Sequence, residues 1–211
     1  AQTTAAVAVV LEDVNAFLAT ADRTMLHDAG WHFLRIGLHL ERAIMTCSAL
    51  RHVLTSSSTG GGADPDRGAS RDNPELSALL RMLGSQDAYR RLYQTRSRPR
   101  QVADFFLRQP AAPRSLFHNL AAIADALRAI DVAPDEAAPV EAAVASLLTR
   151  LRDLDLTRNV SGASGASKAT GEFLSTLLHD LGSFHPLLSD HFFSHQARVT
   201  GLNAPVESIT T

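Results

Sequence analysis

Apolar residues recur every three to four positions along most of the chain, and no stretch alternates strictly between apolar and polar residues. This period is typical of amphipathic helices, whereas strands show a period of two. The pattern predicts an all-α protein, a single helical bundle of about seven to eight helices. One long central helix extends from about Arg23 to Leu54. The other predicted helices cover residues 5–20, 74–84, 86–93, 99–108, 113–130, 138–156 and 168–196.

The segment 55–73 interrupts this pattern with glycine, serine, threonine and aspartate residues. Such a composition cannot bury much apolar surface, so it predicts a flexible surface loop. Pro186 should kink the last helix, because proline lacks a backbone donor and crowds the preceding turn. We expect residues 1–198 to form the helical domain and residues 199–211 to form a tail.

Composition and charge exclude several classes of protein. No apolar run approaches the roughly 20 residues that a membrane-spanning helix needs, so no membrane association is expected. The formal net charge of −2 gives no general attraction to nucleic acid. Cys47 is the only cysteine, so an intramolecular disulfide cannot form and a reducing, cytoplasmic location is expected.

The long central helix carries two apolar faces, which predicts that it packs on two sides. The first face comprises Phe33, Ile36, Leu40, Ala43, Cys47, Leu50 and Leu54, and the second comprises Trp31, Leu34, Leu38 and Met45. A narrow polar stripe separates them, and its spacing is 4, 3, 4, 3 and 4 over Asp28, His32, Arg35, His39, Arg42 and Thr46. This stripe is either a solvated outer face or a row of residues that binds an anion, a carboxylate for example.

Glu41 has no cation three or four residues away on its own helix. We therefore expect Glu41 to be buried and to contact an arginine from a distant segment, with Arg91 and Arg114 as the leading candidates. This contact is either an ion pair that fixes helix packing or part of a functional pocket. Gly37, one turn earlier, could admit a close helix or a ligand beside Glu41.

Arg114 follows Pro113, which should begin a helix. An arginine in the first turn faces the positive end of the helix dipole, so it should have a carboxylate or phosphate partner. The alternatives are an ion pair with Asp104 or another local acid, and a meeting of Arg114 with Glu41 across a cleft.

Several segments together resemble one family. The segment Gly30–Ala43, which contains Glu41-Arg42, resembles the glutamate–arginine motif of the bacterial alpha-E domain, a helical domain of unknown function. Tyr89–Tyr93 is similar to the central Tyr-Arg-Arg segment of that family. The further matches are Met25 with His27-Asp28 before the motif, and Val102–Leu107 followed by Pro113-Arg114-Ser115, which is similar to a Phe-Leu-Leu…Pro-Arg-Ser segment.

Two departures from the family pattern stand out. Leu38-His39 occupy positions where the family often has an arginine pair. The helix with a similar glutamate–arginine element that usually opens the family domain has no counterpart before Ala1. Either that helix was lost, or the chain is the carboxyl-terminal part of a longer protein.

The resemblance implies association with a circularly permuted ATP-grasp amide ligase and with transglutaminase-like peptidases, in a peptide-tagging or peptide-synthesis system. We expect a non-catalytic helical accessory or appended domain that binds this ligase or its peptide substrate. The alternatives are an enzyme that uses Glu41 with nearby arginines as acid or base in an interhelical pocket, and a purely structural scaffold. The candidate binding residues are Arg35, His39, Glu41, Arg42, Arg91 and Arg114, and the candidate interface anchors are Trp31, Tyr89, Tyr93 and Arg91.

The sequence offers little support for other chemistries. His191 and His195 are four residues apart, but Phe192 and Phe193 between them favour a plain amphipathic helix end over a zinc site. Residues 162–168 resemble a phosphate-binding loop only superficially, since Ser167 occupies the place of the glycine before the lysine. We therefore expect no metal and no cofactor, and we expect Cys47 to be an inert core thiol.

Overall fold

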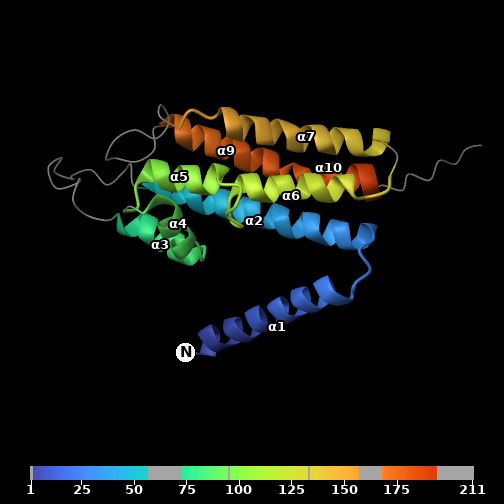
Figure 1. The fold of residues 1–211 in the computed structure, drawn as a ribbon, viewed down its shortest axis with the longest axis horizontal. Coiled ribbons are helices and arrows are strands. Elements are labelled where there is room, and N and C mark those ends of the chain that lie inside the picture. Colours follow the sequence, from blue (N-terminus) through green and yellow to red (C-terminus); the bar gives the residue numbers. More distant parts are fainter. Residues whose placement is uncertain (1, 57–72, 95, 133, 157–167, 194–211) are drawn as a thin grey trace, which may run out of the picture.

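The computed structural model describes residues 2–56, 73–94, 96–132, 134–156 and 168–193. These residues form helices and short connections, and none of them lies in a strand (Figure 1). The all-α prediction is therefore confirmed. Most of the predicted loop at 55–73 and the whole predicted tail lie outside the described residues.

The fold is organised around α2 (Ala29–Ser56), which packs against α6 (Leu116–Arg128) and α9 (Lys168–Gly182). The next layer is α7 (Pro134–Asp153), which packs on α6, and Figure 1 shows these four helices side by side. Three short helices gather at the carboxyl-terminal end of α2 (Figure 1), namely α3 (Pro74–Met82), α4 (Gln86–Tyr93) and α5 (Pro99–Arg108). The first helix, α1 (Gln2–Thr24), stands apart from the bundle in Figure 1.

Only one of the two apolar faces of α2 is packed along its length, and of the second face only Trp31 is buried. Ile36, Leu40, Ala43, Cys47, Leu50 and Leu54 are buried in the core, as predicted. On the opposite side, Leu34, Leu38, Glu41 and Met45 form what we call the outer face of α2, and none of them belongs to the core. Met45 on this face is 61% exposed. The prediction that α2 packs on two sides is therefore wrong for the described residues.

The break between α1 and α2 lies at residues 25–28, about four residues later than predicted. Asp28 explains this position, because its Oδ1 accepts a hydrogen bond from the backbone N–H of Trp31 at 3.2 Å. This is the N-cap arrangement, which satisfies one of the free donors at the start of a helix. Asp28 is thus the cap of α2 and not the first member of its polar stripe.

The carboxyl-terminal helix is bent, as Pro186 predicted. After α9 the chain turns at Ser183, continues as α10 (Phe184–Leu188), and ends in a π-helical turn, η1 (Ser189–Phe193). The bend lies about one turn before Pro186, where the proline ring crowds the backbone. Leu181, Phe184 and Leu188 stay buried across the bend, so both halves pack on the same core.

Candidate functional site

The middle of the polar stripe on α2 lies beneath the start of α6. His39 is buried, and its Nδ1 lies 2.8 Å from Oδ1 of the buried Asn119. The amide nitrogen of Asn119 donates to the carbonyl oxygens of Pro113, at 3.1 Å, and Ser115, at 2.7 Å. This network ties the centre of α2 to the segment that precedes α6. A fully solvated stripe is therefore not what the structure shows.

The network also determines the tautomer of His39. The amide nitrogen of Asn119 faces two carbonyl oxygens, so the other end of the amide, Oδ1, faces His39 and accepts a hydrogen bond from it. His39 must therefore donate from Nδ1, which leaves Nε2 as an acceptor in the neutral ring. Arg35 Nη2 lies 3.5 Å from this Nε2, as a donor should. Burial lowers the pKa of His39 below its usual value of 6.5, and the positive charges of Arg35 and Arg42 act in the same direction.

A tightly bonded loop between α5 and α6 positions Arg114. Ser115 is the N-cap of α6: its Oγ accepts from the N–H of His118 at 3.1 Å and donates to the carbonyl of Gln109 at 2.5 Å. His118 Nδ1 lies 2.9 Å from the carbonyl oxygen of Pro110, to which it donates. Because α6 begins at Leu116, Arg114 precedes the helix, and its predicted place in the first turn is wrong.

Arg35 and Arg114 both lie close enough to Arg42 for their charges to act on it, and we call Arg35, Arg42 and Arg114 the arginine cluster. Arg42 and Arg114 are half-buried, and neither has a hydrogen-bond or ion-pair partner among the described residues. Burial, followed by the charges of Arg114 and Arg35, lowers the pKa of Arg42. Like charges held together without an acid repel one another, and an anion bound between them would remove that repulsion.

Neither predicted partner of Arg114 is found. Asp104 instead accepts hydrogen bonds from Arg108 Nε and from the Tyr93 hydroxyl, both at 2.8 Å. Glu41 is exposed on the outer face of α2 and has no described arginine within ion-pair distance. The predicted burial of Glu41 is wrong, because the face of α2 that carries it is not covered by another described helix.

Two further expectations around Glu41 also fail. A Cβ atom added at Gly37 would meet no atom within 4 Å, so no described helix approaches there. Arg91 is exposed on α4, whereas the arginine cluster lies on α2 and just before α6. Among the predicted interface anchors, Trp31 and Tyr89 are buried within this fold.

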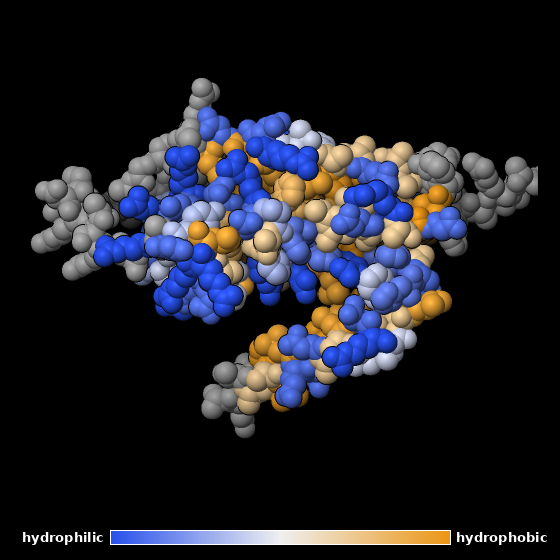
Figure 2. All heavy atoms as spheres, in the orientation of Figure 1, coloured by the Kyte–Doolittle hydropathy of each residue, from blue (hydrophilic) through white to orange (hydrophobic). Residues whose placement is uncertain are grey.

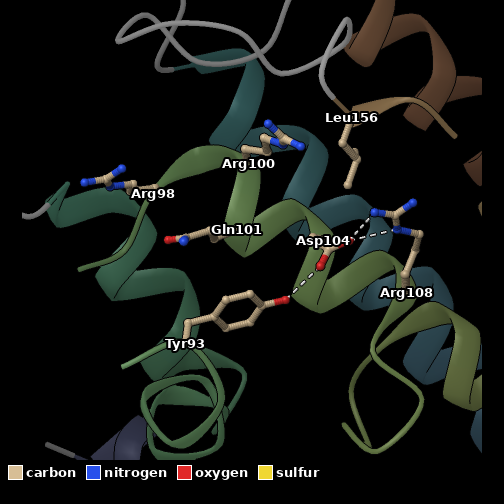
Figure 3. A pocket seen from close by; sticks show the side chains of 7 residues that line it. All are labelled: Tyr93, Arg98, Arg100, Gln101, Asp104, Arg108 and Leu156. Atoms are coloured by element: carbon tan, nitrogen blue, oxygen red, sulfur yellow. Dashed lines mark hydrogen bonds and ion pairs between the residues drawn. The ribbon is translucent and has the colours of Figure 1, made fainter. Parts of the chain in front are cut away.

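A polar hollow of about 380 Å³ lies beside α4 and α5, and Figure 3 shows the side chains that line it. Tyr93 and Arg108, which both line this hollow, donate hydrogen bonds to Asp104. Burial, followed by the contact with Asp104, raises the pKa of Tyr93. Arg98 and Arg100 also line the hollow, but Figure 3 shows that they point away from one another. They therefore do not converge on one ligand as the arginine cluster can.

Comparison with known families agrees with the helical fold. The family model of Alpha-E, described as a predicted alpha-helical domain with a conserved ER motif, matches residues 1–193. The chain belongs to the Alpha-E family. No curated protein and no solved structure gives a significant match to this chain.

Glu41-Arg42 is the only Glu-Arg dipeptide in this Alpha-E chain. Successive residues of a helix point about 100° apart, and the structure separates the two side chains accordingly. Arg42 is half-buried in the arginine cluster, whereas Glu41 is exposed on the outer face of α2. The dipeptide thus contributes to two different surfaces of the domain.

Asn119 and His118 belong to this site of the Alpha-E chain but were not predicted from the sequence. Both lie in α6 just after the Pro113-Arg114-Ser115 segment, at positions Ncap+4 and Ncap+3 from Ser115. An asparagine on the apolar side of α6, one turn after Leu116 and next to Leu120, was the available signal, because a buried amide needs hydrogen-bond partners. Its partner, His39, is 80 residues away in the sequence, and no local pattern identifies such a pair.

Other chemistries receive no support from the described part of this Alpha-E chain. It contains no group of three or more histidine, cysteine, aspartate or glutamate side chains that could hold a metal ion. None of its helices combines the length and apolar character needed to cross a bilayer. Cys47 is fully buried, so its predicted place in the core is confirmed, and burial raises its pKa to about 12. His195 and most of residues 162–168 lie outside the described residues.

Proposed function

We propose that this chain is a non-catalytic binding domain of an ATP-grasp amide ligase system, and that its arginine cluster holds a carboxylate group of the peptide substrate. The observation that supports this proposal is the proximity of Arg35 and Arg114 to the half-buried Arg42, without an acidic partner for any of the three among the described residues. Guanidinium groups suit planar carboxylates because they can donate two parallel hydrogen bonds.

The surrounding network favours binding because the cluster is preorganised. Asn119 and Ser115 hold the segment that carries Arg114, and Arg35 donates to His39. A ligand therefore does not have to order these groups, which lowers the entropic cost of binding. The competing hypothesis, with Glu41 as the acid or base of an interhelical pocket, has less support because Glu41 is exposed.

Calorimetric titration tests the ligand. A short peptide with a free α-carboxylate is titrated into the 211-residue chain, and the same peptide with an amidated carboxyl terminus is the matched ligand. The free carboxylate should bind at least about ten-fold more tightly, since only it can form charge-assisted hydrogen bonds. Inorganic phosphate is a third ligand, and tighter binding of phosphate than of either peptide would overturn the choice of carboxylate.

Variants locate the site. Arg42→Gln and Arg114→Gln should each weaken peptide binding by about ten-fold or more, because each loses a partly buried charge partner. Arg128→Gln is the control, since this arginine is exposed and pairs only with Asp125 on its own helix. Equal losses in all three variants would show that the attraction is general and not located at the cluster.

The link to the ligase needs a separate measurement. The chain is mixed with the circularly permuted ATP-grasp ligase of the same organism, and ATP consumption is measured with peptide for each protein alone and for the mixture. Stimulation of the ligase by the wild-type chain and not by Arg42→Gln supports the proposal. A ligase that neither binds the chain nor changes its rate of ATP consumption would contradict it.

A further inference from the structure

The helix α1 presents an apolar face that no other described helix covers. Figure 1 shows α1 separated from the bundle, and Figure 2 shows apolar side chains along it. The face comprises Val7, Val10, Leu11, Val14 and Phe17, which are 53%, 60%, 58%, 48% and 61% exposed. A surface helix of a soluble protein normally buries such a stripe against another element.

The outer face of α2 has the matching pattern. Its members Leu34, Leu38, Glu41 and Met45 are spaced by 4, 3 and 4 residues, and Val7, Val10, Val14 and Phe17 on α1 are spaced by 3, 4 and 3. This alternation is the spacing of the seam along which two helices pack as a coiled coil, and Leu34, Leu38 and Met45 supply the apolar positions on α2. At 1.5 Å per residue, the 23 residues of α1 extend about 34 Å, so α1 can follow most of the 28-residue α2.

The connection between the two helices holds α1 away from its own α2. The His27 ring stacks on Trp31 with the ring centres 3.9 Å apart, and His27 Nε2 lies 3.3 Å from the carbonyl oxygen of Asp22 near the end of α1. On the α2 side, the guanidinium of Arg35 lies 4.8 Å from the Trp31 ring centre. These contacts join the connection to both helices and fix the open angle seen in Figure 1.

The charges of the two helices favour contact between α1 and α2 over contact between two copies of α1. The charged residues of α1 are Glu12, Asp13, Asp22 and Arg23, which give a net charge of −2. Those of α2 are Arg35, Glu41, Arg42 and Arg51, which give a net charge of +2 with neutral histidines. Two copies of α1 would therefore repel one another, whereas α2 as a whole attracts α1, although Glu41 is the one charged residue on its outer face.

We propose that the chain forms a symmetric dimer in which α1 of each copy covers the outer face of α2 in the other copy. A two-fold axis makes this contact twice, and exchange of an identical element is a common route to dimers. Two helix contacts of this length should together bury more than about 1,000 Å², the area expected of a specific interface. The dimer does not depend on the proposed ligand, because the arginine cluster lies on a different side of α2.

Sedimentation equilibrium of the 211-residue chain tests the proposal, with two variants that each place a charge in one of the faces. Val14→Asp alters α1, and Met45→Asp alters the outer face of α2. Ala16→Asp is the control, because this residue is exposed on the opposite side of α1 and receives the same side chain. Circular dichroism checks that all variants keep their helix content.

The wild-type chain and Ala16→Asp should be dimers, and Val14→Asp and Met45→Asp should each raise the dissociation constant by about ten-fold or more, because a buried unpaired charge is costly. An equimolar mixture of the two weakened variants should dimerise better than either alone, since α1 of Met45→Asp and α2 of Val14→Asp are both intact. A monomeric wild-type chain would overturn the proposal. A mixture that dimerises no better than its components would also overturn the proposal. That result is expected if α1 packs on α2 of its own chain, because an intact face on one chain cannot then replace a damaged face on another.

Discussion

Replacing Asn119 by alanine removes the amide that joins α2 to the segment before α6. Asn119 is fully buried and makes three hydrogen bonds, one with His39 and two with backbone carbonyls. Alanine keeps the helix propensity of α6 high, so the loss falls on these hydrogen bonds and on a small cavity. The variant therefore measures what the network contributes to the fold.

The expected magnitude follows from the group that is left without a partner. His39 Nδ1 loses its fully buried partner, whereas the Ser115 carbonyl still accepts the backbone N–H of residue 119 at 3.2 Å, and water can replace the partly buried bond to Pro113. A buried polar group without a partner costs about 1–3 kcal/mol, so His39 alone predicts a loss of about this size. This is a large fraction of the 5–15 kcal/mol that typically stabilises a protein.

Urea unfolding followed by circular dichroism measures this loss, and an unchanged m-value would show that the unfolded state is unaffected. Asp125→Ala is the control on the same helix, since Asp125 pairs with Arg128 and both side chains are about two-thirds exposed or more. It should change the free energy of unfolding by less than about 1 kcal/mol. If Asn119→Ala is no more destabilising than Asp125→Ala, the network does not hold the two segments together.

Four further outcomes are expected. Thr46 Oγ1 is buried and has no hydrogen-bond partner in the described part of the chain, so Thr46→Val should raise the free energy of unfolding by about 1 kcal/mol in the same assay, and a decrease would reveal a partner in solution. Gly37→Ala should raise it by about 0.5–1 kcal/mol, because Gly37 lies inside α2 with open space around it, and thermal unfolding can check this. The NMR titration of the His39 ring should give a pKa below 6.5 in the folded chain. Between that pKa and 6.5 the unfolded chain binds more protons than the folded chain, so the free energy of unfolding should fall as the pH drops through 6.5 and level off below the folded pKa. Cys47 should not react with a thiol reagent at pH 8 in the folded chain, because burial raises its pKa to about 12, and rapid labelling would contradict this.

The sequence predicted the helices well, because their apolar periods and end signals are local. The predicted bounds of α4 and α5 agree with the structure, where Pro99 begins α5 and Gln94 ends α4 in a left-handed conformation. The start of α6 was predicted too early, since Pro113 was taken as the first helical residue although Ser115 is the cap.

The candidate site was predicted in part. The stripe residues Arg35, His39 and Arg42, and also Arg114, come together, because helical spacing fixes which residues of α2 share a side. The position of Glu41 could not be predicted in the same way. Helical spacing shows that Glu41 lies between apolar residues, but not whether another helix covers that side, and here none of the described helices does.

The separation of Glu41 from Arg42 makes the order of the two residues matter as well as their presence. Exchanging them, as Glu41→Arg with Arg42→Glu, leaves composition and net charge unchanged. It would nevertheless place a carboxylate between Arg35 and Arg114, where it could pair with them and occupy the place of an anionic ligand. It would also put a cation on the outer face of α2. The order of glutamate and arginine in this dipeptide therefore decides which side of α2 carries the negative charge and which carries the positive charge.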